Sequence, residues 1–340
     1  MAQSKRKATT RRPRVPVYFA TNRNPNRKSN PDDFGPDFNE VSVDSLRFGV
    51  ATCRIDRTPK VEKIRVARES LKEDESKSKL GSKEMFALLR ESMQKGVDTL
   101  VFVHGYNVSF REAIETGAAI HKAYPMPLNV VVFSWPSDGS MMPFLAYKRD
   151  RTDAAASAPA FARGILKLRD FLCDVRRGDE CGARIHLMAH SMGNYVLRNG
   201  LQEAMRHGSV PRMFEQIFLM AADEDHDAFE KEHKLARLPE IGNGVNVYFN
   251  RGDTALVLSD RTKSNPTRLG SHGPRLPLNV PANVTNLDVS EIVSGLVEHG
   301  YLVDDKRVVA DVAQVLRGTA QDKVTKRKYV ASQNRYVLRK

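Results

Sequence analysis

Ser191 has the sequence setting that best suits nucleophilic chemistry. It lies in the stretch Ala189-His190-Ser191-Met192-Gly193, after an apolar run that predicts a strand and before a run that predicts a helix. A serine at a tight turn between a strand and a helix is lifted out of the packing, so its hydroxyl is available to attack a substrate. Small residues two places before and after it, here Ala189 and Gly193, leave room for such a strained turn. We therefore predict that Ser191 is a nucleophile, and the alternative is a capping serine at an ordinary turn.

Alternating apolar runs and helical patterns indicate how Ser191 is positioned. The expected strands are 15–20, 46–55, 99–107, 128–135, 185–188, 216–222, 245–250 and 283–289. Between them, apolar residues at helical spacing predict helices over 82–95, 109–123, 194–201 and 306–316, and an Ala-rich helix ends near 175. We expect residues 24–45 to form a surface loop and 56–82 to be irregular or partly extended. The alternation predicts an α/β fold with a mostly parallel central sheet and helices on both faces.

The length of 340 residues fits one large domain better than two small ones. We expect a catalytic domain over 15–318, between a basic disordered tail at 1–14 and a basic C-terminal tail at 319–340. Residues 140–160 interrupt the pattern with several large apolar side chains. This segment is either a cap over a substrate cleft or a helix packed in the core.

Six short motifs, in this order, resemble the α/β-hydrolase superfamily and, within it, a bacterial "domain of unknown function" family of presumed serine hydrolases. They are residues 18–23, 103–107, 133–137, 147–151, 189–193 and 219–223. Alanine stands at 189 where the usual serine motif has glycine, and one extra methyl group still fits beside the turn. The resemblance implies an α/β-hydrolase fold and a nucleophilic serine mechanism that needs no cofactor. It does not supply a substrate.

In this superfamily the catalytic residues follow the chain order serine, acid, histidine, each after a strand at one edge of the sheet. The resemblance therefore assigns the acid to Asp253, after the expected strand 245–250, and the base to His299, after 283–289. A histidine takes the proton of the serine hydroxyl, while a carboxylate orients the imidazole and stabilises its cation.

Three other residues compete for these roles. Asp223 follows the strand 216–222 and is the alternative acid, with Asp225 as a third choice. His272 is the alternative base, although it precedes the last expected strand. The acidic run 223–227 also suggests Ca²⁺ or Mg²⁺, but no other segment has spacing that would complete a ligand shell, so we expect no metal site.

The resemblance also assigns an oxyanion hole and a substrate pocket. His104-Gly105 ends a strand whose following loop supplies one backbone donor in this superfamily, here the amide of Tyr106 or Asn107. The amide of Met192, after the nucleophile, supplies the second. We expect His104, Asn107 and Trp135 at the substrate pocket, with core packing as the alternative for Trp135.

Positive charge is concentrated at the two ends of the chain. Residues 1–28 contain nine Lys or Arg and no acid, and residues 317–340 contain eight against one acid, whereas the whole chain carries only +13. The body is therefore slightly negative, which argues against a basic cleft that follows a nucleic-acid backbone. We expect solvated tails, and the alternative is that they contact nucleic acid or an anionic surface.

The composition indicates the cellular compartment of the protein. No run approaches the roughly 20 apolar residues of a membrane span, and the basic start lacks the apolar core of a secretory signal. Cys53, Cys173 and Cys181 make an odd number without metal-binding spacing, which suits structural or free thiols in a reducing compartment. We expect a cytoplasmic protein, and the sequence leaves its oligomeric state open.

Together, the serine motif and the resemblance predict a serine hydrolase that cleaves a carboxylic ester or related small acyl substrate through an acyl-enzyme on Ser191. Peptidases and amidases use the same machinery. The alternative is a binding or scaffold protein on a hydrolase fold whose basic tails contact nucleic acid or an anionic surface.

Overall fold

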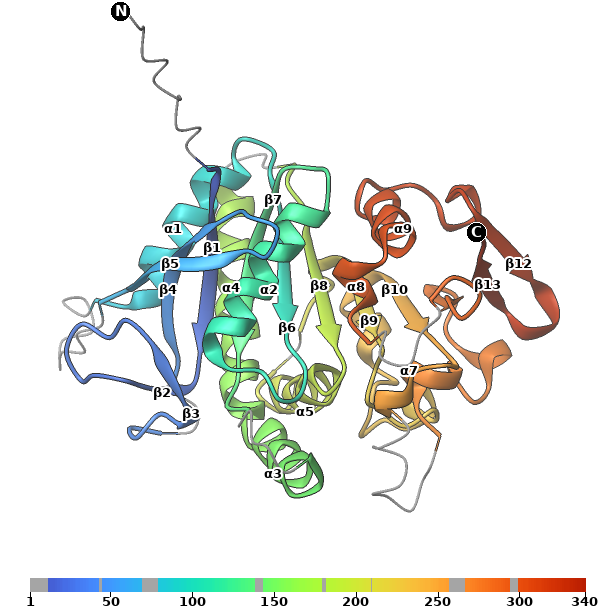
Figure 1. Ribbon diagram of the computed structural model, residues 1–340, viewed down its shortest axis with the longest axis horizontal. Coiled ribbons are helices and arrows are strands. Elements are labelled where there is room, and N and C mark those ends of the chain that lie inside the picture. Colours follow the sequence, from blue (N-terminus) through green and yellow to red (C-terminus); the bar gives the residue numbers. More distant parts are fainter. Residues whose placement is uncertain are drawn as a thin grey trace, which may run out of the picture.

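An 11-stranded sheet is the framework of the protein in this computed structural model (Figure 1). The structure describes residues 12–42, 45–68, 79–137, 143–178, 182–208, 210–256, 267–293 and 299–340. The strand order is β12-β13-β11-β10-β9-β8-β6-β7-β1-β4-β5. The strands are β1 (Arg14–Thr21), β4 (Arg47–Arg54), β5 (Lys60–Val66), β6 (Asp98–Val103), β7 (Leu128–Ser134), β8 (Ile185–His190), β9 (Phe214–Met220), β10 (Gly242–Phe249), β11 (Val284–Asp288), β12 (Arg327–Val330) and β13 (Arg335–Leu338).

Most neighbouring strands run parallel, from β1 through β7, β6, β8, β9, β10 and β11 to β13. Antiparallel pairs occur only toward the edges of this sheet, where β4 and β5 follow β1 and where β12 pairs with β13. Every residue of β6 and β7 is buried, as expected for parallel strands covered on both faces. The predicted α/β class with a mostly parallel sheet is confirmed.

Helices cover both faces of the sheet, and the sheet separates the hydrophobic core into two parts, one under each layer of helices. The described helices are α1 (Gly81–Met93), α2 (Phe110–Ala123), α3 (Pro143–Ala156), α4 (Ala158–Gly178), α5 (Gly193–Arg206), α7 (Leu269–His272), α8 (Tyr301–Asp304) and α9 (Lys306–Leu316), with short 3₁₀ turns η2 (Ala228–Glu230), η3 (Leu238–Glu240), η4 (Pro277–Asn279), η5 (Gln321–Lys323) and η6 (Ala331–Gln333). Helices α1, α4 and α5 pack on one face, against side chains such as Val103. Helices α2, α8 and α9 pack on the other, where the adjacent Phe102 points, because side chains alternate along a strand.

Residues 24–45, predicted to be a loop, contain a small hairpin instead. Strand β2 (Arg23–Pro25) pairs with β3 (Phe34–Phe38) in a separate two-stranded sheet. Phe34 anchors it, with its ring centroid 6.0 Å from Phe19 and 4.7 Å from Phe110. A single apolar anchor in a polar, Pro-containing stretch leaves little strand pattern in the sequence.

Residues 319–340, predicted to be a solvated basic tail, instead extend the sheet as β12 and β13. The guanidinium of Arg327 is buried and donates to both carboxylate oxygens of Asp311 in α9, at 2.6 Å each. Tyr248 also donates its hydroxyl to Asp311, at 2.5 Å. Acids of the body therefore hold the basic segment in place, and β10 and β11 are not the last strands of the fold.

Some sequence predictions fall partly outside the described residues. Of the expected N-terminal tail 1–14, only 12–14 are described, and Arg14 already begins β1. The side chains of Cys173 and Cys181 lie outside the described part, whereas Cys53 is buried and free. Among the described helices, none has both the length and the apolar character that a membrane span requires.

Candidate active site

Ser191 lies at the turn between β8 and α5, with φ at +52° and 7% of its surface exposed. This left-handed backbone conformation is uncommon for a residue other than glycine. The adjoining strand β9 fixes the turn: the Ser191 amide donates to the Met220 carbonyl at 3.0 Å, and its carbonyl accepts from the Asp223 amide at 3.2 Å. The surroundings therefore hold a strained serine in one conformation, a feature that clusters at functional sites.

Two glycines allow the chain to pass close to this turn. A Cβ atom on Gly193 would lie 2.5 Å from the carbonyl oxygen of Val103 and 2.6 Å from that of His104. A Cβ atom on Gly105 would lie 2.9 Å from the Ser191 Cβ atom. All three distances are below normal contact, so glycine is needed at both positions for the β6 loop to reach the serine.

Asp253 and His299 form a hydrogen-bonded pair. His299 donates from Nδ1 to Asp253 Oδ2 at 2.7 Å, and its side chain is 20% exposed. Asp253 is buried, and its other oxygen accepts from the amides of Ala255 and Leu256 at 3.1 and 3.3 Å. This arrangement places the proton of a neutral imidazole on Nδ1 and leaves Nε2 able to accept one.

His190 connects this pair to the serine turn. Its Nε2 atom donates to the His299 carbonyl at 2.8 Å, and the two imidazole centroids lie 4.7 Å apart. Because His190 directly precedes Ser191, His299 lies beside the serine turn. Among the described residues no hydrogen bond joins the Ser191 hydroxyl to His299, and such contacts often tighten only when substrate binds.

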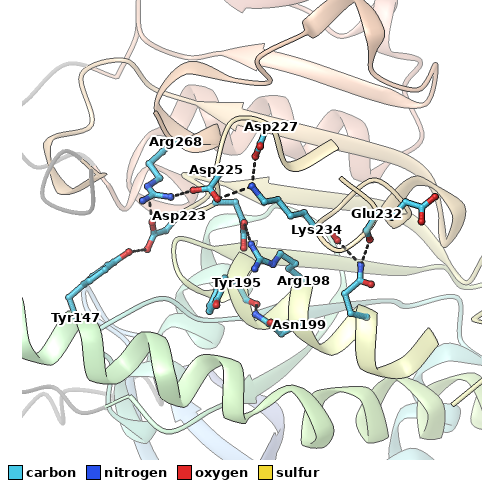
Figure 2. A network of polar contacts seen from close by, with 12 residues as sticks. Tyr147, Tyr195, Arg198, Asn199, Asp223, Asp225, Asp227, Glu232, Lys234 and Arg268 are labelled. Carbon is cyan, nitrogen blue, oxygen red and sulfur yellow. Dashed lines mark hydrogen bonds and ion pairs between the residues drawn. The ribbon is translucent and has the colours of Figure 1, made fainter. Parts of the chain in front are cut away.

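The competing candidates have other partners. Figure 2 shows Asp223 between Tyr147, which donates its hydroxyl to Oδ2 at 2.6 Å, and Arg268, 3.5 Å from Oδ1. Asp225 pairs with Arg268 and with Lys234, the latter at 2.9 Å. The structure does not bring either carboxylate to His299.

His272, the alternative base, lies exposed at the end of α7. Its Nδ1 atom is 2.8 Å from the Ser271 hydroxyl. Among the described residues, no three His, Cys, Asp or Glu side chains form a group that could hold a metal ion.

The loop after β6 carries the predicted oxyanion donors. Asn107 has φ at +58°, and its amide donates to Asp150 of α3 at 3.2 Å. That amide is therefore engaged, which favours Tyr106 as the candidate donor in this loop. Met192 is the N-cap residue of α5. The first backbone amides of a helix have no hydrogen-bond partner within the helix, and the helix dipole is positive at this end. Both properties suit the predicted role of the Met192 amide as the second oxyanion donor.

The predicted pocket residues His104 and Trp135 are buried beneath this loop. Their rings stack at a centroid distance of 5.2 Å, and Trp135 Nε1 donates to the His104 carbonyl at 2.9 Å. Both side chains are therefore packed in the interior, and their place at a substrate pocket stays a prediction. Asn107, the third residue predicted at the pocket, has an exposed side chain.

Arg23 is a supporting residue that the sequence prediction missed. Its buried guanidinium donates to the carbonyls of Val108 and Ser137, at 2.6 and 3.3 Å, and to the Ser134 hydroxyl at 2.9 Å. These contacts join the loops after β6 and β7. The available signal was its place in the motif 18–23.

The motif 147–151 fastens α3 beside the site. Besides its bond to Asp223, Tyr147 packs edge-on against Tyr106, with the centroids 5.8 Å apart. Arg151 lies 3.6 Å above the ring of Tyr195 in α5. Helix α3 lies beyond the carboxyl end of β8 (Figure 1). The described part of the expected cap, 143–160, therefore includes a helix that packs against α4 and α5 at that edge of the sheet.

Comparison with known families agrees with the fold. Residues 81–318 match a family described as alpha/beta hydrolase of unknown function (DUF900). The chain belongs to this family. The resemblance seen in the sequence motifs is therefore confirmed for the fold and for the broad class of alpha/beta hydrolase.

Other relatives of this DUF900 member are distant. An uncharacterized protein, alr1448, from Nostoc is 24% identical over 237 residues, which cover 55% of this chain and 58% of that protein. Lipase B of Aspergillus fumigatus has a TM-score of 0.37 at 10% identity, with 66% of this chain and 53% of the lipase covered. Carboxylesterase CesB of Bacillus subtilis has a TM-score of 0.24 at 14% identity, with 70% and 87% covered. Likenesses at this level do not transfer a substrate.

Two histidines in this DUF900 protein, buried His104 and half-buried His190, make its stability sensitive to acid. Burial lowers the pKa of His104 to about 3, with the charge of Arg23 adding to the effect, and burial beside His299 lowers the pKa of His190 to about 3. An unfolded histidine titrates near 6.5, so between these values the unfolded state binds more protons and stability falls as pH falls. We expect each to contribute up to about 1.4 kcal/mol of lost stability per pH unit.

Urea unfolding at pH 7.5, 6 and 5 measures this loss. The variant His104→Gln is expected to show a shallower pH dependence than the wild type, whereas His233→Gln, at an exposed position, keeps the wild-type dependence. Equal slopes in all three proteins would contradict the assignment.

Proposed function

We propose that this protein is a serine hydrolase that cleaves a carboxylic ester or related small acyl substrate through an acyl-enzyme on Ser191. The observation that carries the proposal is the 2.7 Å bond between His299 and Asp253, held beside a strained serine turn. Membership of an alpha/beta hydrolase family supports it. The chain order of these three residues also agrees with that of the superfamily.

In the proposed mechanism the Ser191 hydroxyl attacks the substrate carbonyl while its proton moves to His299 Nε2. Asp253 keeps the imidazole in the accepting tautomer and stabilises the cation that forms. The amides of Tyr106 and Met192 stabilise the negative oxygen of the tetrahedral intermediate. His299 then returns the proton to the leaving group, and the same base activates the water that releases the acid.

The proposed function does not include binding of nucleic acid by the basic ends of the chain. Basic residues of the C-terminal segment pair with the body, as Arg327 does with Asp311 and Arg335 with Asp288. No specific observation in the described part of the chain favours the scaffold alternative. The cysteine content remains our reason to expect a cytoplasmic location.

Labelling with a fluorophosphonate tests the proposal directly. We expect the folded protein to gain one adduct, seen by intact mass, which peptide mapping assigns to Ser191. Heat-denatured protein is the control and should remain unlabelled, because the serine is activated only by its folded surroundings. A folded protein that takes up no probe, or takes it up at another residue, would overturn the mechanism. Paired nitrophenyl esters and anilides then separate esterase from amidase activity.

A further inference from the structure

We propose that His190 is a positioning residue that holds the catalytic base against the serine turn. This inference rests on the proposed function, since it assigns His299 as the base. His190 uses its Nε2–H to reach the main-chain carbonyl of His299 at 2.8 Å. A carbonyl oxygen only accepts, so this contact requires His190 in the tautomer with its proton on Nε2.

Two separate anchors then fix the His299 imidazole. Asp253 holds the ring through Nδ1, and His190 holds the backbone of the same residue through its carbonyl. One anchor alone leaves the ring free to swing about the bond that remains. With both in place, the position of Nε2 relative to the serine turn is determined.

The chain that follows His299 is anchored independently. Tyr301 at the start of α8 accepts a hydrogen bond from the Ala221 amide at 2.7 Å and donates one to the Tyr248 carbonyl at 3.0 Å. His190 therefore acts on His299 itself and is not needed to hold α8. Its removal should loosen the base while leaving the fold in place.

His190 also suits this role because it stays uncharged. Burial and the neighbouring His299 keep the pKa of His190 at about 3, so it remains a neutral donor when His299 gains a proton. A second imidazolium with its ring centroid 4.7 Å from that of the base would oppose the proton transfer. Catalysis depends steeply on alignment, and an error of about 1 Å costs on the order of 10²-fold.

Three substitutions of His190 test the proposal against wild type. His190→Gln keeps an N–H donor at similar reach, His190→Leu keeps the volume without a donor, and His190→Asn carries a donor that is too short. We expect His190→Leu and His190→Asn to lower kcat for a nitrophenyl ester by about 10- to 100-fold with KM unchanged, and His190→Gln to recover most of that loss. His207→Leu, at an exposed position, is the matched control and should keep the wild-type kcat. Melting temperatures identify any variant that does not fold.

The outcomes separate this inference from the proposed function. A wild type that labels at Ser191, together with a folded His190→Leu or His190→Asn variant of unchanged kcat, overturns the positioning role alone. The positioning role is also overturned if the kcat of His190→Gln is no higher than that of His190→Leu and His190→Asn. The hydrogen bond would then not matter, and only the shape of the imidazole would. A folded wild type that neither labels nor hydrolyses esters overturns the proposed function and this inference with it.

Discussion

Replacement of Ser191 by alanine is expected to lower kcat for ester hydrolysis by about 10³- to 10⁶-fold, because the attacking oxygen is lost while the rest of the site remains. The backbone should tolerate the change, since Ala221 adopts the same left-handed conformation in this protein, with φ at +46°. Steady-state kinetics with a nitrophenyl ester measures the loss. The melting temperature should stay close to that of wild type.

Thr152→Ala is the matched control for Ser191→Ala. It removes another hydroxyl, from the exposed surface of α3 near the same edge of the sheet, and should leave kcat unchanged. A Ser191→Ala protein that keeps more than about a tenth of the wild-type activity would show that the nucleophile lies elsewhere, since loss of a catalytic nucleophile costs far more.

Replacement of Asp253 by asparagine is expected to lower kcat by about 10³- to 10⁴-fold. The amide keeps the shape of the carboxylate but can present an N–H group to His299 Nδ1, which favours the wrong imidazole tautomer. It also cannot stabilise the imidazolium. The side-chain oxygen of asparagine can keep the hydrogen bonds that Asp253 Oδ1 accepts from the amides of Ala255 and Leu256, so the variant should still fold.

The variant Asp223→Asn distinguishes between Asp253 and Asp223 as the catalytic acid. Asp223 contacts Tyr147 and Arg268, not His299, so the amide is expected to reduce stability through the weakened contact with Arg268 while changing kcat less than about tenfold. Both variants should be measured well below their melting temperatures. If Asp223→Asn is the more damaging change in kcat, then Asp223 is the catalytic acid and the pairing with Asp253 is structural.

The parallel core of the fold was predictable because buried strands leave continuous apolar runs. Strands β6 and β7 are of this kind, and both begin within one residue of the expected position, although β6 ends at Val103, four residues before its expected end. The end of β9 was not predictable in the same way. Ala221 and Ala222 continue its apolar run, yet Ala221 has a positive φ and has already left the strand, which ends at Met220.

For the site, chain order was more informative than local pattern. The chain order of the superfamily, with each catalytic residue after a strand, pointed to Asp253 and His299, and the structure pairs them. The direction of a side chain beyond a strand leaves no such signal, so the burial of His104 was not predicted and that of Trp135 was only an alternative. Contacts to main-chain carbonyls, such as those of Arg23 and His190, depend on three-dimensional packing and were not readable from residue types.

Several basic residues near the two ends of the chain pair with acids elsewhere in the folded molecule. At one edge of the sheet Arg14 pairs with Glu62, and at the other Arg327 pairs with Asp311 and Arg339 with Glu291, at distances of 2.5 to 2.7 Å. The ends of the polypeptide thus serve as counterions for its own middle. They also shield the sheet, because β1, β4, β5, β12 and β13 all lie outside the family-matched residues 81–318 and flank the strands within them. A protein trimmed to 81–318 would lose these ion pairs and its edge strands, and would expose β7 and β11 as open templates for aggregation.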